Sequence, residues 1–186
     1  EGQPIAAGGF VPVIEQMGLM RLIDRKVLDL GLDALENNPE MNLSINVSGM
    51  TAVDPVWLRR LEERLQDRLD IASRLIVEIT ETVALDDINE SSRFVSSLTK
   101  FGCRVALDDF GAGFTSFRHL RALNVALVKI DGSFVRGITE SPDNLLFVQT
   151  LVSLSRGIEL ECVAEWVETA EEAELLRAEG IDLLQG

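Results

Sequence analysis

Short apolar runs that each end in a polar residue recur along this chain, and this recurrence constrains the fold more than any other feature. Consecutive run ends are separated by 20 to 36 residues, which leaves room for one crossover helix between strands. Such an alternation favours an α/β fold with a parallel sheet. The six residues at or near these ends are Asn46, Glu78, Asp108, Lys129, Glu165 and Gln185.

The segments between the runs carry helix signals. Asp54 followed by Pro55 is typical of an N-cap and a first helical position, and Thr169 with Glu172 has the spacing of a capping box. Helices are expected to end near three glycines, which are Gly102, Gly157 and Gly180.

Apolar residues at helical spacing predict two faces that pack on the core. The first comprises Met20, Ile23, Val27, Leu30 and Ala34, and the second comprises Leu58, Leu61, Leu65 and Leu69.

Two adjacent carboxylates, Asp108 and Asp109, stand at the end of one apolar run. Two like charges about 4 Å apart repel by about 4 kcal/mol at an effective dielectric of about 20. A divalent cation would offset this repulsion. A solvated turn that caps the next helix is the alternative for an isolated pair. The repetition of polar strand ends favours the cation, because the carboxyl ends of parallel strands meet on the face where barrel enzymes build their chemistry.

The oxygen donors at these ends are the carboxylates of Glu78, Asp108 and Asp109 and the amide of Asn46. No thiolate or imidazole accompanies them, so the set suits Mg²⁺ or Mn²⁺ rather than zinc or copper. Two ions about 4 Å apart would stabilise the attacking and the leaving oxygen of an in-line phosphoryl displacement.

Two further residues have open roles. Lys129 would orient the attacking water or offset phosphate charge, and the alternative is an ion pair with Asp131 or Asp109. Glu81 follows Glu78 by three positions, which places it at the loop or on the opposite side of a strand. We therefore expect Glu81 to brace the structure rather than bind the same ion.

Composition limits the class of protein. A chain of 186 residues that is 46% hydrophobic predicts one globular domain over residues 1–186. The net charge of −14 and the lack of a Lys/Arg cluster disfavour binding to a nucleic-acid polymer. No apolar run reaches the roughly 20 residues of a membrane span, and no secretory signal is visible, so no membrane contact is expected.

The cysteines and the histidine narrow the chemistry further. Cys103 and Cys162 lie in or beside predicted strands and are interpreted as reduced core thiols, which is compatible with the cytoplasm. His119 is the only histidine, which excludes a His-clustered zinc site and makes a Ser-His-Asp mechanism a poor fit.

The order of the motifs resembles that of EAL domains, the bacterial phosphodiesterases that act on cyclic di-GMP. The match extends over essentially the whole chain, and the ordered set is far more specific than any single tetrapeptide. The matching segments are Phe10-Val11-Pro12, Glu15-Gln16-Met17-Gly18-Leu19, Asn46-Val47-Ser48, Glu78-Ile79-Thr80-Glu81, Asp108-Asp109-Phe110-Gly111-Ala112-Gly113, Lys129-Ile130-Asp131, Ser133-Phe134-Val135, Glu165-Trp166-Val167-Glu168 and Gln185-Gly186.

This resemblance implies a TIM-like (β/α)8 barrel of the EAL type, in which the first strand runs antiparallel to the rest. The first strand, with the Glu-Ala-Leu motif, and the last strand and helix are expected to lie outside the given sequence. The implied reaction is hydrolysis of cyclic di-GMP to linear pGpG with Mg²⁺ or Mn²⁺. Further expectations are a homodimer, an upstream sensory or GGDEF-type domain, and a cytoplasmic location for the domain, with membrane tethering of the parent protein left open.

The resemblance also implies a role for each site residue. The metal ligands would be Asn46, Glu78, Asp108 and Asp109. Lys129 would position the catalytic water, with Glu165 near the metals and Gln185 beside that water. Glu81 would anchor the loop over residues 110–116, which helps to form the second metal site and the dimer contact and is expected to transmit signals from a partner domain.

Two departures from the family pattern leave every ligand in place. Ala112 stands where threonine is common, and Trp166 stands where glycine is common, so Trp166 would alter the substrate mouth. A non-hydrolysing cyclic di-GMP receptor is the alternative function. A third interpretation, a TIM-barrel enzyme for sugar phosphates, does not explain the ordered motifs.

Overall fold

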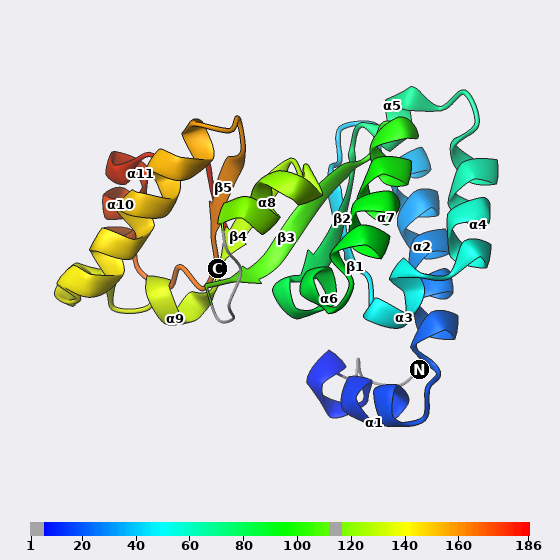
Figure 1. Ribbon diagram of the computed structural model, residues 1–186, viewed down its shortest axis with the longest axis horizontal. Helices are drawn as coiled ribbons and strands as arrows, with labels where there is room; N and C mark the ends of the chain where they lie inside the picture. Colours follow the sequence, from blue (N-terminus) through cyan, green and yellow to red (C-terminus); the bar gives the residue numbers. More distant parts are fainter. Residues whose placement is uncertain (1–5, 112–116) are drawn as a thin grey trace.

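The structure is a computed structural model that describes residues 6–111 and 117–186. Strands and helices alternate along most of the chain (Figure 1). The strands are β1 (Leu43–Asn46), β2 (Leu75–Thr80), β3 (Arg104–Phe110), β4 (Leu127–Ile130), β5 (Glu161–Ala164) and β6 (Leu183–Leu184). The helices are η1 (Ala7–Gly9), α1 (Val11–Gln16), α2 (Met20–Asn37), α3 (Gly49–Ala52), α4 (Pro55–Leu65), α5 (Leu69–Ala72), α6 (Glu81–Asp86), α7 (Ile88–Lys100), α8 (Phe117–Leu123), α9 (Gly132–Val135), η2 (Ile138–Glu140), α10 (Pro142–Arg156) and α11 (Ala170–Glu179).

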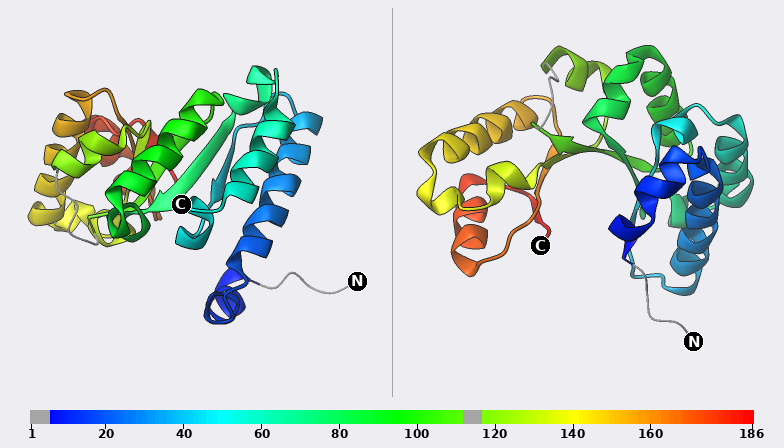
Figure 2. Two further views of the ribbon diagram at one scale, coloured as in Figure 1. Left: turned by 45° about the vertical axis from the view of Figure 1, so that its right-hand side comes forward. Right: turned by 90° about the horizontal axis from the view of Figure 1, so that it is seen from below.

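The six strands form one sheet in the order β1-β2-β3-β4-β5-β6, and every neighbouring pair is parallel. The sheet curls into an arc with helices along its outer side (Figure 2). This arrangement confirms the predicted α/β fold with a parallel sheet, and it corresponds to part of a TIM-like barrel.

Side chains alternate between the two faces of the curled sheet, as the period of two in a strand requires. The outer face packs on the helices through residues such as Val77, Leu107 and Val128. The inner face carries a small apolar cluster of Ala106, Leu127 and Val163. Strands covered on both faces explain why the sequence shows continuous apolar runs rather than strict alternation.

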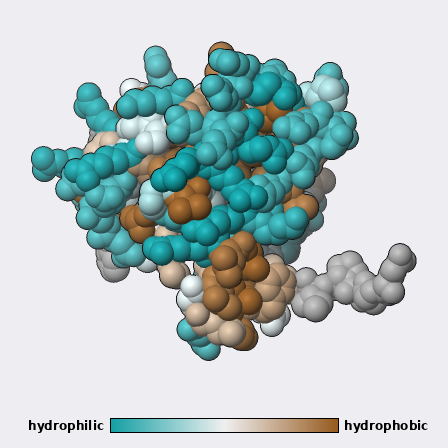
Figure 3. Space-filling model, turned by 90° about the vertical axis from the view of Figure 1, so that its right-hand side faces the viewer, coloured by the Kyte–Doolittle hydropathy of each residue, from teal (hydrophilic) through white to brown (hydrophobic). Residues whose placement is uncertain are grey.

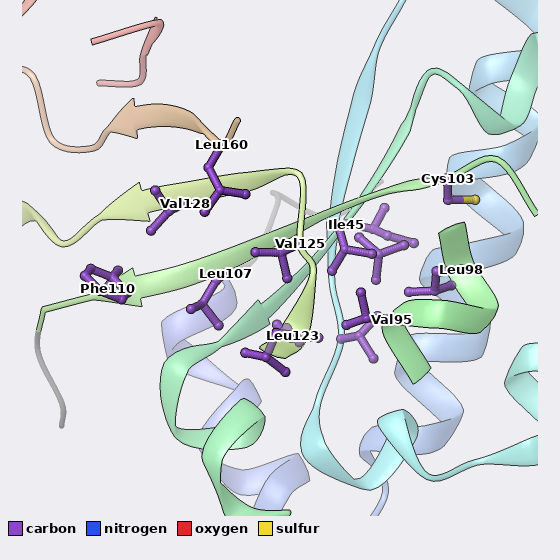
Figure 4. Close-up of a cluster of buried hydrophobic side chains, with 14 of the residues drawn as sticks. Ile45, Val95, Leu98, Cys103, Leu107, Phe110, Leu123, Val125, Val128 and Leu160 are labelled. Atoms are coloured by element: carbon purple, nitrogen blue, oxygen red, sulfur yellow. The ribbon is translucent and has the colours of Figure 1, made fainter. Parts of the chain in front are cut away.

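The main core lies between the outer face of the sheet and the helices. Figure 4 shows part of it, including Ile45 of β1 and Val95 and Leu98 of α7, which belong to the same buried cluster. Trp57 of α4 and Phe94 of α7 are both fully or almost fully buried, and their ring centroids lie 5.8 Å apart. The thiols of Cys103 and Cys162 are free and buried in this core, as predicted.

Helix α2 follows the predicted stripe at Met20, which is buried, but not at Leu30. Leu30 is 54% exposed, and the buried face of the helix instead contains Leu28, Gly31 and Leu32. A Cβ atom on Gly31 would lie 3.1 Å from the Leu43 side chain, so glycine lets α2 approach β1 closely. The side of α2 that faces the core is therefore the side that contains Gly31. Leu69 was predicted to be buried as well, but it is 69% exposed.

The predicted helix signals are confirmed. The Asp54 side chain accepts a hydrogen bond from the Val56 amide at the start of α4. Thr169 and Glu172 form a capping box at the start of α11, and Gly180 ends that helix in the left-handed conformation. These caps therefore determine where α4 and α11 begin and where α11 ends.

The segment formed by η1 and α1 projects from the body of the protein. Apolar side chains gather on it in the space-filling view (Figure 3), and Val13 and Met17 are exposed. Among the residues that the structure describes, no helix combines the length and the apolar character needed to cross a bilayer.

Candidate active site

The predicted site residues lie at the carboxyl ends of the strands. On each of three inner strands, the polar residue follows a buried inner-face residue by two positions, so it points to the same concave side. Glu78, Lys129 and Gln185 line one hollow of about 280 Å³ on this side. The inner-face pairs are Ala106 with Asp108, Leu127 with Lys129, and Val163 with Glu165.

Lys129 is the centre of the site. Its ammonium lies 2.6 Å from the Glu165 carboxylate, 2.9 Å from Glu78 and 3.0 Å from Asp108. All four side chains are buried. The alternative considered from the sequence was an ion pair with Asp131 or Asp109, but Lys129 pairs with these three carboxylates, which the parallel strand order brings near β4.

The surroundings of Lys129 favour the protonated form of its side chain. Burial alone would lower the pKa of its ammonium, but hydrogen bonds to Glu165, Glu78 and Asp108 reverse this effect and raise the pKa above its ordinary value. Lys129 therefore keeps its positive charge among these three carboxylates.

Asp108 and Asp109 converge through an irregularity in β3. Adjacent residues of a regular strand point to opposite faces. Here the pairing of β3 with β4 shifts register between Leu107 and Phe110, and Asp109 adopts a left-handed conformation with φ of 56°. The Asp109 amide donates a hydrogen bond to the Asp108 carboxylate at 3.1 Å. Such bulges redirect side chains near functional sites.

The carboxylates of Asp108, Asp109 and Glu165 form one candidate metal centre, with one oxygen of each lying within 4.8 Å of the others. Asp109 is solvent-exposed, yet partial desolvation and the charges of Asp108 and Asp131 raise the pKa of its carboxyl. Burial raises the pKa of the Glu165 carboxyl, and the ion pair with Lys129 opposes that shift. The three hard oxygen donors fit Mg²⁺ or Mn²⁺.

The other two proposed ligands lie on neighbouring strands. Glu78 connects to the candidate metal centre through Lys129, whose ammonium donates a 2.9 Å hydrogen bond to the Glu78 carboxylate. Asn46 ends β1 in register with Glu78, and its side chain is exposed. Gln185 follows β6, and its backbone amide donates to the Ala164 carbonyl beside Glu165. The outer strands thus bring their polar ends to the same edge.

Glu81 lies at a different point from the metal centre. It is the first residue of α6 and is buried, and its carboxylate accepts a hydrogen bond from the Gly111 amide at 3.0 Å. Gly111 has φ of 103°, and a Cβ atom there would lie 2.7 Å from Phe134 and 2.8 Å from Phe147. The remainder of the predicted glycine loop, residues 112–116, lies outside the described residues.

The sequence profile of the EAL domain family matches residues 1–186. The chain belongs to the EAL domain family. The chain is 33% identical over 189 residues to cyclic di-GMP phosphodiesterase PdeF of Escherichia coli, covering 98% of this chain. It is 34% identical over 182 residues to the probable cyclic di-GMP phosphodiesterase PdeA of the same species, covering 95% of this chain. The chain spans about a quarter of the length of each of these relatives.

Solved structures of EAL domains superpose closely on this one. The PaMucR phosphodiesterase in complex with c-di-GMP gives a TM-score of 0.91 at 31% identity, covering 98% of this chain and 81% of that one. A relative named MucR in Pseudomonas aeruginosa is described as a bifunctional diguanylate cyclase/cyclic di-GMP phosphodiesterase, and it is 32% identical, over 98% of this chain and 27% of its own length. The Xanthomonas citri FimX EAL domain gives a TM-score of 0.93 at 22% identity, covering all of this chain and 75% of that one, which shows the shared fold.

Two features of this EAL domain were missed in the sequence. Glu165 was predicted to lie near the metals but was not counted among the ligands, and its carboxylate oxygen lies within 4.8 Å of those of Asp108 and Asp109. Asp131, which was considered only as a partner of Lys129, instead raises the pKa of Asp109. Both residues end apolar runs, so their positions at strand ends could be predicted from the sequence. Their contacts could not, because these depend on the order of the strands in the sheet and on the irregularity in β3.

Proposed function

We propose that this EAL domain hydrolyses one phosphodiester bond of cyclic di-GMP to give linear pGpG, with Mg²⁺ or Mn²⁺ as the cofactor. The observation that carries this proposal is the meeting of Asp108, Asp109 and Glu165 beside the Lys129 ammonium. The names of the similar proteins, cyclic di-GMP phosphodiesterase and PaMucR phosphodiesterase in complex with c-di-GMP, support the substrate.

The metal ligands in this proposal are Asn46, Glu78, Asp108 and Asp109, joined by Glu165. A divalent cation held there would withdraw charge from the phosphodiester and lower the pKa of the attacking water. The cluster needs such a cation before it can accept a phosphate, because four carboxylates face one ammonium at this edge of the sheet.

The protein's own groups position the reactants. Lys129 is held by three carboxylates and so presents its charge at a fixed point, where it orients the water and offsets charge on the phosphate. Gln185 contributes an amide beside that water. Glu81 holds the Gly111 amide and thereby fixes the start of the loop that follows β3.

The proposal is tested by incubating the protein with cyclic di-GMP and Mn²⁺ or Mg²⁺, with a parallel sample in excess chelator. Chromatography that separates cyclic di-GMP, pGpG and GMP measures the product. Appearance of pGpG only with metal supports the phosphodiesterase. Binding of cyclic di-GMP without any product would contradict it and assign the domain as a non-hydrolysing receptor.

Dimerisation through the loop over residues 110–116, a neighbouring GGDEF-type or sensory domain, and a cytoplasmic location stay predictions. Light scattering with and without cyclic di-GMP would measure the oligomeric state of the protein. A Vibrio cholerae LapD fragment whose name includes GGDEF and EAL domains shares this fold, with a TM-score of 0.89 at 21% identity, covering 100% of this chain and 46% of that chain.

A further inference from the structure

Trp166 occupies an unusual position for a large aromatic residue. It directly follows Glu165, it is 53% exposed, and its backbone is left-handed with φ of 56°. The other aromatic side chains that the structure describes are buried or only partly exposed. An L residue with a bulky side chain rarely adopts this conformation, and strained positions of this kind concentrate at functional sites.

The indole is held in place from two sides. A Cβ atom on Gly132 would lie 2.3 Å from Cδ1 of the indole, so Trp166 packs directly on the backbone at the start of α9. The guanidinium of Arg136 lies over the ring at 3.9 Å from its centroid, and Arg136 also pairs with Glu168 at 3.7 Å. The ring is therefore braced, although more than half of the residue faces solvent.

The braced ring stands at the edge of the proposed active site. Gly132 follows Asp131, whose charge acts on Asp109, and Trp166 follows Glu165, which belongs to the metal centre. The indole thus packs the segment that follows the carboxyl end of β5 against the segment that follows the carboxyl end of β4. It adds little to the core, because its exposed area stays in water.

We propose that Trp166, braced by Arg136, is a stacking platform for a purine base of the substrate. This inference rests on the proposed function. In the proposed function, the carboxylate cluster and its cations bind the phosphate. A cyclic dinucleotide also presents two flat bases, which these groups do not contact. Aromatic side chains stack on bases, and a cation on the other face of the ring strengthens the platform.

The test compares three variants in steady-state hydrolysis of cyclic di-GMP with Mn²⁺. Trp166→Gly removes the ring and also relieves the left-handed backbone, so folding is preserved. We expect its KM to rise about tenfold with kcat nearly unchanged, since stacking binds substrate and transition state alike. Trp166→Phe retains a ring, so its KM should rise only about twofold to threefold. Leu146→Ala removes an exposed apolar side chain of α10 and should leave KM unchanged.

A second measurement uses the unaltered protein. Trp57 is fully buried, so acrylamide quenches mainly Trp166. Stopped-flow mixing with excess cyclic di-GMP should protect Trp166 from quenching, and Trp166→Phe should lose this signal while retaining turnover. If the protein turns over cyclic di-GMP but quenching does not change and Trp166→Gly keeps its KM, the platform is contradicted. If the protein neither binds nor hydrolyses cyclic di-GMP, the proposed function itself fails.

Discussion

The Lys129 ammonium lies 2.6 Å from the carboxylate of Glu165; Lys129 belongs to β4, and Glu165 directly follows the neighbouring strand β5. The contact is buried, so removal of either partner leaves an uncompensated charge in a region of low dielectric. Through the shared ammonium, this ion pair links Glu165 of the candidate metal centre to Glu78 and Asp108.

Replacement of Lys129 by methionine should destabilise the metal-free protein by about 3 kcal/mol, because three buried carboxylates lose their shared cation. Mn²⁺ should recover more stability in Lys129→Met than in the wild type, because the cluster then lacks the ammonium that three of its carboxylates contact. Urea unfolding with Mn²⁺ and with chelator measures both effects. Lys26→Met, at an exposed position on α2, is the control. An equal Mn²⁺ effect in all three proteins would contradict the prediction.

Replacement of Gly111 by alanine should destabilise the protein by about 2 to 4 kcal/mol, because a left-handed backbone penalty adds to a clash with Phe134 and Phe147. Gly137→Ala is a matched control, since Gly137 also has a positive φ but its added Cβ would meet nothing within 4 Å. We expect it to cost only about 1 kcal/mol. Chemical denaturation of both variants measures the difference, and equal losses would rule out the clash.

Glu172 makes stability depend on pH. Hydrogen bonds from the backbone amides of Gly137, Glu168 and Thr169 lower the pKa of its carboxyl. A lowered pKa in the folded state adds stability above the ordinary glutamate pKa of 4.5, and this stability is lost as the pH falls through the lower folded value.

Glu172→Gln should therefore be less stable than the wild type by about 1 kcal/mol at pH 7, because it loses a carboxylate acceptor. The difference should shrink below about pH 4 as the wild-type carboxyl becomes protonated. Free energies of unfolding in urea at several pH values measure this, with the exposed Glu174→Gln of α11 as the control. A difference that stays constant with pH would show that the charge of Glu172 is unimportant.

Much of this fold could be predicted from the sequence because its signals are local. The polar residues that end the apolar runs fall at strand ends, and the capping box of Thr169 and Glu172 is present as predicted. The predicted face of α2 was wrong at Leu30 because apolar residues lie on more than one side of that helix. Only the approach of Gly31 to β1 decides which side is buried.

The contacts of the site were less predictable. Glu78 and Lys129 are 51 residues apart, and their hydrogen bond depends on the order of the strands. The convergence of Asp108 with Asp109 depends on a register shift and a positive φ that no spacing rule reveals. The sequence therefore indicated which residues share an edge of the sheet, while the structure decides which of them touch.

Metal-dependent hydrolysis is tested by the rate of pGpG formation from cyclic di-GMP by the wild type, Asp108→Asn and the control Glu174→Gln, each with Mn²⁺ and with chelator. Loss of a ligand that holds the metal should reduce kcat at least about a hundredfold in Asp108→Asn. Glu174→Gln should match the wild type, and chelator should stop all three. Full activity in Asp108→Asn, or hydrolysis that persists in chelator, would contradict a metal-dependent phosphodiesterase built on these carboxylates.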